Sequence, residues 1–223
     1  MSKALVIRGA DFSANAVAQV DIELPYDAEI SYLQGDGTAY IKSGISAKWN
    51  TQFEIGVNIT ESAPTVNGTI FGSRVDTNES NLIVYLDGVS ATKQWNWRYG
   101  ADIHNVVFEQ RAGDYVISNL DSPRKLDVSG NAINSYTSNE ASFTNGLEIY
   151  ILSWNNSGTG PAPSTSGNTI VKLKFCKIYQ NGQLVRNYIP VRVGQVGYLY
   201  DKVSRTFFGN AAESGAFVLG PDK

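Results

Sequence analysis

The feature that most constrains how this chain can fold is a pair of β-type runs separated by Asn181 and Gly182. The first run, 170–180, interleaves apolar residues with lysines, and the second, 183–191, continues in the same manner. Asn-Gly tolerates positive φ at both positions, as a two-residue type I′ turn requires. Alternation on both sides of such a turn indicates two strands that each bury one face. The segment therefore predicts an antiparallel hairpin with one buried face.

Further short β-type runs, separated by turn residues, recur along the chain. They lie at 5–7, 17–24, 53–59, 81–86, 93–99, 106–108, 115–117 and 147–152. The chain has 223 residues, of which 42% are hydrophobic and 17% charged, with 21 glycines, and helix signals are almost absent. This balance is typical of an all-β protein with frequent turns. We expect one domain, an all-β sandwich of two antiparallel sheets with Greek-key connections.

The amino-acid sequence of the closing hairpin resembles that of a known family. Residues 175–192, together with 196–210 and 215–221, are similar to the closing strands of a laminin G-like, concanavalin A-like jelly-roll domain found in gut bacteria and their phages. Residues 30–45 resemble the opening strand pair of that domain, and 69–74 a central strand. The resemblance implies the jelly-roll sandwich of lectins and glucanases. That sandwich hosts lectins, glycosidases, adhesion modules and structural proteins, so no single function is implied.

The resemblance also suggests how the chain is divided. It covers residues 29–221, so we expect a jelly-roll domain at 29–223 preceded by an N-terminal segment at 1–28. That segment is either an additional edge strand or an arm that docks on a partner chain. A Gly-, Ser-, Asn- and Pro-rich stretch at 153–168 is expected to form a mobile loop at one end of the sheets.

Charge and cysteine content exclude several classes of function. A net charge of -3 lacks the excess of positive charge with which proteins bind nucleic acid or an anionic membrane surface. Cys176 is the only cysteine, so we expect no intramolecular disulfide and no zinc site built on several thiolates. We predict that Cys176 is a small buried apolar residue. No apolar run in the sequence as given is long enough for a secretory signal or a membrane span.

Catalytic motifs are absent from the sequence, and we predict that the protein is not an enzyme. His104 is the only histidine, and a strand or turn histidine hydrogen-bonded to a neighbour is its expected role. Glycosidases of this fold need two carboxylates across one sugar. The closest pair, Asp21 and Glu23, alternates with apolar residues, which places both acids on the solvent face of a strand. We therefore assign no catalytic residue.

A weak candidate for a metal site lies in the polar turn that contains Asp76, Asn78 and Glu79. Carboxylates and amides are the ligands that Ca²⁺ prefers, and lectin-type sandwiches often hold it at the rim of a sheet. The spacing matches no fixed calcium motif, so a polar turn without metal is the favoured interpretation. We expect no other cofactor.

Candidate ligand contacts come from two places. Trp97 belongs to a stripe of alternating aromatic residues at 95–99 that more often forms core than a binding platform, and Arg98 lies on the opposite face of the same run. Trp154 precedes two amides, Asn155 and Asn156, where a strand gives way to the loop, so we expect it to be exposed. We take these five residues as the candidate ligand-binding set, with sugars as candidate ligands.

Two functions remain open. The first is a non-enzymatic structural protein of a phage virion, such as a tail, fibre or capsid-decorating component, that contacts other virion chains or host glycans. We expect such a protein to be located in the virion and to form a homo-oligomer. The alternative is a carbohydrate-binding or adhesion module at the bacterial cell surface. Binding would use aromatic anchors with a polar rim.

Overall fold

The computed structural model describes residues 24–61, 65–75, 80–88, 94–106, 112–129, 133–161 and 165–223. Side chains are described over the same ranges except at 103–106, 133–134 and 165–167. The runs expected at 5–7 and 17–23 lie outside these ranges, and so do Asp21, Glu23, Asp76, Asn78 and Glu79. The boundary expected at residue 28 therefore stays a prediction.

The larger of the two sheets contains the predicted hairpin. Its hydrogen-bonded order is β11 (Ile133–Thr137), β10 (Lys125–Ser129), β9 (Gly113–Ser118), β4 (Gln52–Ile59), β14 (Val171–Gln180), β15 (Gln183–Val193), β16 (Val196–Asp201) and β17 (Thr206–Phe208). Three two-residue strands join it at its margins: β1 (Ala28–Glu29) on β15, β2 (Leu33–Gln34) on β14, and β18 (Val218–Leu219) on β2. All these pairs are antiparallel.

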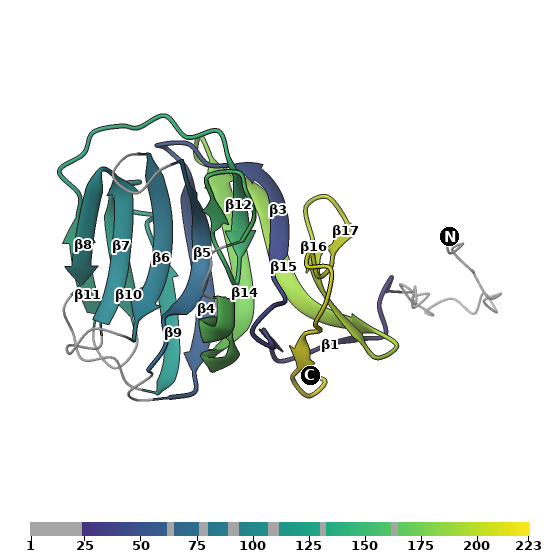
Figure 1. Cartoon of the computed structure of the whole chain (residues 1–223). Coiled ribbons are helices and arrows are strands. Elements are labelled where there is room, and N and C mark those ends of the chain that lie inside the picture. The colour runs from purple at the N-terminus through teal and green to yellow at the C-terminus, as the bar shows by residue number, and fades with distance from the viewer. Residues whose placement is uncertain are drawn as a thin grey trace, which may run out of the picture.

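The smaller sheet faces the larger one (Figure 1). Its order is β3 (Ile41–Ser46), β12 (Glu148–Ile151), β5 (Gly68–Arg74), β6 (Asn81–Asp87), β7 (Gln94–Gly100) and β8 (Asp102–Val106). The short strand β13 (Asn155–Asn156) adds to β5 in parallel, and a 3₁₀ helix, η1 (Thr165–Ile170), leads into β14. The predicted all-β, two-sheet antiparallel sandwich is confirmed.

The core fills the space between the two sheets. Phe53 of β4 packs on Phe71 of β5 with ring centroids 4.8 Å apart, and Trp97 of β7 meets Phe53 at 5.9 Å. These residues belong to one contiguous cluster of buried side chains contributed by strands of both sheets. Such a core is what holds a two-layer sandwich together, because each sheet must bury one apolar face.

The predicted hairpin is confirmed, with one irregularity that the sequence interpretation missed. Asn181 and Gly182 have φ of 51° and 73°, as a type I′ turn requires, and β14 pairs antiparallel with β15. The pairing of β14 with β4 shifts register between Leu173 and Phe175. Cys176 is fully buried, as predicted, and Phe175 is only partly buried. A β-bulge here turns Phe175 away from the core and onto the outer face of the larger sheet.

Other local expectations need correction. The run expected at 106–108 is described only at Val106, the last residue of β8, because 107 and 108 lie outside the described residues, and the pair β10 and β11 was not predicted. The stretch 153–168, expected to be a loop, contains β13 and the start of η1. Within the described residues, no helix is long and apolar enough to cross a membrane.

Candidate functional site

The aromatic stripe on β7 lies in the core. Trp95, Trp97 and Tyr99 have no exposed surface. Trp97 therefore does not belong in the candidate ligand-binding set, because a fully buried indole cannot present its ring to a ligand. The more common role of such a stripe, packing between two sheets, is the one observed.

Trp154 is buried rather than exposed, which corrects the sequence expectation. Only 8% of its surface is accessible, and its ring packs against Tyr85 with centroids 5.5 Å apart. The reason is β13, which pairs Asn155 with Ser73 and Asn156 with Arg74. This pairing keeps the chain beside β5 where the sequence suggested that it leaves the sheet. Trp154 and Tyr85 form, with Ile83, a small apolar cluster separate from the core.

Two arginines cover this pair of rings on the outer face of the smaller sheet. The Arg74 guanidinium lies 6.0 Å from the Trp154 ring centroid, and the Arg98 guanidinium lies 5.5 Å from the Tyr85 centroid. Arg98 also donates a hydrogen bond from Nη2 to the Tyr85 hydroxyl at 3.0 Å. We name Arg74, Tyr85, Arg98 and Trp154 the basic-aromatic cluster. The cation-to-ring distances fall within the range of attractive cation–π contacts.

The two amides after Trp154 have structural partners. Asn155 is buried, donates from Nδ2 to the Glu148 carbonyl at 3.1 Å and accepts from the Gly158 amide at 3.0 Å. Asn156 accepts from Arg74 Nε at 2.8 Å. Of the five candidate residues, the structure therefore brings Trp154, Asn156 and Arg98 to one face and leaves Trp97 in the core and the side chain of Asn155 buried beside β5.

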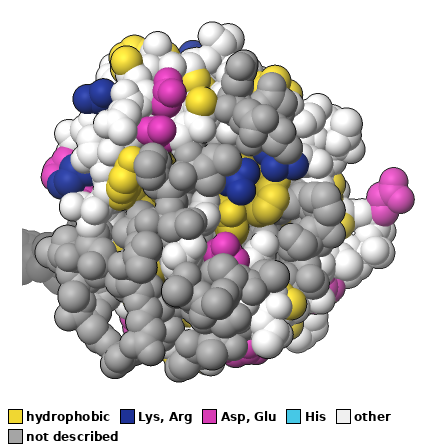
Figure 2. Space-filling model, turned by 60° about the vertical axis from the view of Figure 1, so that its left-hand side comes forward, with side chains coloured by type: hydrophobic (Ala, Val, Ile, Leu, Met, Phe, Trp, Pro, Cys, Tyr) yellow, Lys and Arg dark blue, Asp and Glu magenta, His cyan; other side chains and the backbone are white. Residues whose placement is uncertain are grey.

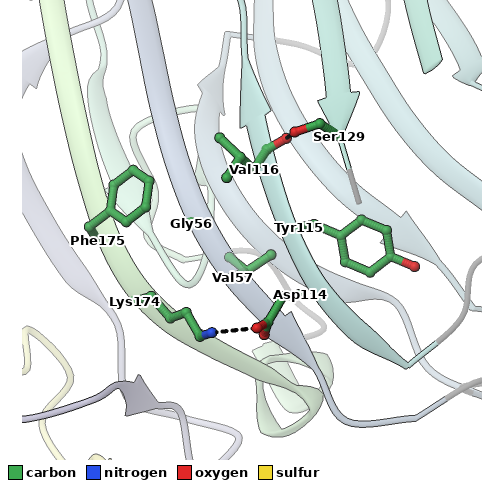
Figure 3. A pocket seen from close by; sticks show the side chains of 8 residues that line it. All are labelled: Gly56, Val57, Asp114, Tyr115, Val116, Ser129, Lys174 and Phe175. Atoms are coloured by element: carbon green, nitrogen blue, oxygen red, sulfur yellow. Dashed lines mark hydrogen bonds and ion pairs between the residues drawn. The ribbon is translucent and has the colours of Figure 1, made fainter. Parts of the chain in front are cut away.

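A second candidate site, which the sequence interpretation did not find, lies on the outer face of the larger sheet. It is a pocket of about 400 Å³ lined by Gly56, Val57, Asp114, Tyr115, Val116, Ser129, Lys174 and Phe175. Along the register, Phe175 of β14 stands opposite Gly56 of β4, and Gly56 stands opposite Val116 of β9. Figure 3 shows Gly56 between Phe175 and Val116. We name this pocket the Phe175 trough.

Glycine at position 56 is what allows the trough to exist. A Cβ on Gly56 would lie 2.2 Å from Cε1 of Phe175, so the ring occupies the space that any other residue would fill. The ring therefore rests on bare backbone. This is the close approach of a side chain for which glycine is required in a strand.

Charged side chains border the trough in matched pairs. Lys174 Nζ lies 2.8 Å from Asp114 Oδ2, and Asn58 donates to Asp114 Oδ1 at 2.7 Å. Lys177 Nζ lies 2.7 Å from Glu54 Oε2 and 5.4 Å from the Phe175 ring centroid. Figure 3 shows Lys174 reaching across from β14 to Asp114.

These pairs shift the acidity of their members in the expected directions. The hydrogen bond from Lys174, helped by the one from Asn58, holds the pKa of Asp114 below its usual range. The hydrogen bond to Glu54 raises the pKa of Lys177. The charged forms of Asp114 and Lys177 are therefore favoured, and each lies beside a group of opposite charge, so the charges bordering the ring are paired.

Trp49 is a third feature that the sequence interpretation passed over. It is 46% exposed, whereas the other three tryptophans, at 95, 97 and 154, are buried. Its carbonyl accepts a hydrogen bond from the hydroxyl of Tyr99 at 2.7 Å, which ties the turn between β3 and β4 to the core. The sequence did indicate that this tryptophan is exposed, because Trp49 lies between a lysine and an asparagine in the segment that separates two strand-like runs.

The structure leaves the metal and catalytic expectations untested. Within the described part of the chain, no group of three His, Cys, Asp or Glu side chains is placed to hold a metal ion. Asp76, Asn78 and Glu79 lie outside that part, and so do Asp21 and Glu23. His104 lies on β8 opposite Trp97 of β7, and its side chain is not among those described.

Comparison with known proteins supports the fold. No known protein family matches the chain, and no curated protein is similar enough in sequence to count as a relative. Among solved structures, a putative carbohydrate binding protein from Bacteroides ovatus matches with 11% identity and a TM-score of 0.53, over 86% of this chain and 60% of that one. A mutant of Trypanosoma rangeli sialidase displaying trans-sialidase activity matches with 15% identity and a TM-score of 0.35, over 59% of this chain and 21% of that one. The first likeness shows a shared fold with a protein that is considerably longer, and the second carries no argument.

Proposed function

We propose that this chain is a non-catalytic carbohydrate-binding module that holds a neutral oligosaccharide in the Phe175 trough. The observation that carries the proposal is the partly buried ring of Phe175, resting on Gly56 and bordered by paired charges. An aromatic ring can stack on the apolar face of a pyranose, and carboxylate, ammonium and amide groups can bond its hydroxyls. The fold shared with a putative carbohydrate binding protein supports the same class of function.

The trough favours a neutral ligand. Lys174 and Lys177 each contact a carboxylate within 2.8 Å, so a charged sugar would have to break an ion pair to gain one. Sugar hydroxyls can instead add to the hydrogen-bonding capacity that these side chains retain, because a carboxylate accepts several bonds and an ammonium donates three.

Isothermal titration with a panel of neutral oligosaccharides tests this proposal, with Phe175→Ala as the variant. We expect at least one member of the panel to bind, and the substitution to weaken that binding at least tenfold, which is about 1.4 kcal/mol. Leu184→Ala, at an exposed position in the same sheet, is the control and should bind normally. Full retention of affinity in Phe175→Ala would remove the trough from the site.

The location and assembly of the protein stay proposals. The fold likeness favours the carbohydrate-binding alternative over the phage-virion interpretation, which gains no support from the comparisons, and a bacterial cell-surface location is part of the same proposal. Membership in the laminin G-like family and the formation of a homo-oligomer are likewise proposals. Light scattering of the full chain, and of a version that starts at Ala28, would test whether residues 1–27 drive self-association.

A further inference from the structure

The basic-aromatic cluster differs from the trough in how its positive charge is partnered. Among the described residues, Arg98 forms no ion pair with a carboxylate, and its guanidinium contacts the ring and the hydroxyl of Tyr85. Its Nε is buried and makes no hydrogen bond. A partly buried cation that has an unfilled buried donor and no anionic partner carries a desolvation cost that pairing would offset. The arrangement therefore leaves Arg98 with capacity for an anion.

The neighbouring groups increase that capacity. Nε1 of Trp154 is also buried and has no hydrogen-bond partner, and the whole residue is only 8% exposed. Arg74 places a second guanidinium over the same pair of rings, from β5, while Arg98 comes from β7. Tyr85 lies on β6, between these two strands. Figure 2, turned so that the β8 side comes forward, shows basic side chains directly beside hydrophobic ones.

We propose that the basic-aromatic cluster is a second binding site, which takes the oxyanion of an acidic sugar, a carboxylate or a sulfate ester. This inference rests on the proposed carbohydrate-binding function. A guanidinium presents parallel N–H donors that match the two oxygens of such a group, and these charge-assisted bonds are stronger than neutral ones. The aromatic rings beneath hold the guanidinium groups in place through the cation–π contacts described above.

The two faces of the sandwich would then select different parts of a glycan. The trough, with cancelled charges, holds neutral units, and the cluster, with an unpaired arginine, holds acidic ones. Arg98 is the specificity-determining residue in this arrangement, because its guanidinium has no carboxylate partner within the described part of the chain.

The test uses the full chain carrying Trp49→Phe, which removes the exposed indole so that fluorescence reports the buried tryptophans, Trp154 among them. The probes are a uronic-acid oligosaccharide, the same oligosaccharide with its carboxyl groups reduced to alcohols, and sodium acetate and sodium sulfate alone. The variants are Arg98→Gln and Arg98→Lys. Arg205→Gln is the matched control, because it removes the same charge at an exposed turn between β16 and β17.

We expect the acidic oligosaccharide to bind and to change the fluorescence, with affinity at least tenfold lower in Arg98→Gln and several-fold lower in Arg98→Lys, which keeps the charge but loses the paired donors. Arg205→Gln should bind normally. If Arg98→Gln does not fold by circular dichroism, Arg98→Lys decides the question. Unchanged affinity in the folded variants, or equal affinity for the acidic and reduced oligosaccharides, would overturn the proposal.

The two proposals fail separately in this design. Binding of the acidic oligosaccharide that depends on Arg98, without any binding of neutral sugars, would refute the trough and keep the cluster. Acetate or sulfate that binds as tightly as the acidic oligosaccharide would show an adventitious ion only and would overturn the assignment to sugars.

Discussion

The outer faces of the two sheets use similar side chains in different partnerships. On the larger sheet, Lys174 and Lys177 contact carboxylates, and the ring of Phe175 stays partly accessible over a glycine. On the smaller sheet, Arg74 and Arg98 lie over aromatic rings that are almost completely buried. The first face offers a ring with neutralised surroundings, and the second offers a cation with apolar support.

This difference shows that the partner of a side chain is more informative than its type. The smaller sheet carries Trp95 and Trp97 on β7, yet these rings, like those of Tyr85 and Trp154, are buried. The accessible ring belongs to the sheet with fewer tryptophans, and the residue that makes it accessible, Gly56, has no side chain at all. Four experiments test whether the two faces act independently.

The largest effect is expected from Trp97→Ala, which should damage both faces together. Trp97 is fully buried, packs on Phe53 and neighbours Arg98 in the same strand. Removing a buried tryptophan typically costs about 3–5 kcal/mol of unfolding free energy. Urea denaturation measures the loss, and Arg98→Gln, on the outer face, should cost far less. Comparable losses in the two variants would contradict the assignment of these neighbours to opposite faces.

The second effect should separate the faces. A Cβ in Gly56→Ala would meet the Phe175 ring at 2.2 Å, so the ring has to leave its place. We expect neutral-sugar affinity to fall about tenfold, or about 1.4 kcal/mol, with acidic-sugar affinity unchanged. Gly146→Ala is the matched control, because a Cβ there has no atom within 4 Å. Titration calorimetry of both sugars compares the variants, and an equal loss for both sugars would rule out independent sites.

Salt should distinguish the faces more gently. Raising ionic strength from about 0.05 M to about 0.5 M shortens the screening length and weakens exposed charge interactions. We expect acidic-sugar affinity to fall several-fold, because it depends on Arg98, and neutral-sugar affinity to change by less than about twofold. Parallel titrations at the two salt concentrations provide the measurement. A strong salt dependence for the neutral sugar would indicate that the charges around the trough are not cancelled in solution.

The smallest effect concerns acid. The pKa of Asp114 is lowered, mainly by the hydrogen bond from Lys174, so the charged carboxylate is the form favoured in the folded protein. Its contribution to stability is present above the usual carboxylate pKa of about 4 and is lost as pH falls below that value. Neutral-sugar affinity should therefore be constant from about pH 8 to about pH 5 and weaken slightly in stronger acid. Asp114→Asn should lack this acid-dependent step, and a transition centred near pH 6 in either protein would argue against Asp114 as its source.

Much of the fold could be predicted from the sequence, because its determinants are local. The Asn181 and Gly182 turn and the alternation in β4 and β7 are each visible within a few residues, and each is found where expected. The resemblance of the closing segments to a jelly-roll domain pointed to the same sandwich.

The sites could not be predicted in the same way, because they depend on pairings between distant residues. Phe175 and Cys176 are adjacent apolar residues that interrupt the alternation of β14, which hinted at the bulge, but only the register shows Gly56 beneath the ring. Similarly, nothing near Trp154 in the sequence reveals that β13 pairs with β5 and buries the indole. The position of a strand edge is a tertiary property.

The burial of Cys176 makes the reactivity of its thiol a measure of how often the two sheets separate. The thiol is the only one in the chain, it has no exposed surface, and burial raises its pKa, so the reactive thiolate is suppressed while the two sheets stay together. A thiol-alkylating reagent can therefore modify Cys176 only when the layers separate. The rate at which the mass of the protein increases under native conditions would measure the rate of that separation, without denaturant.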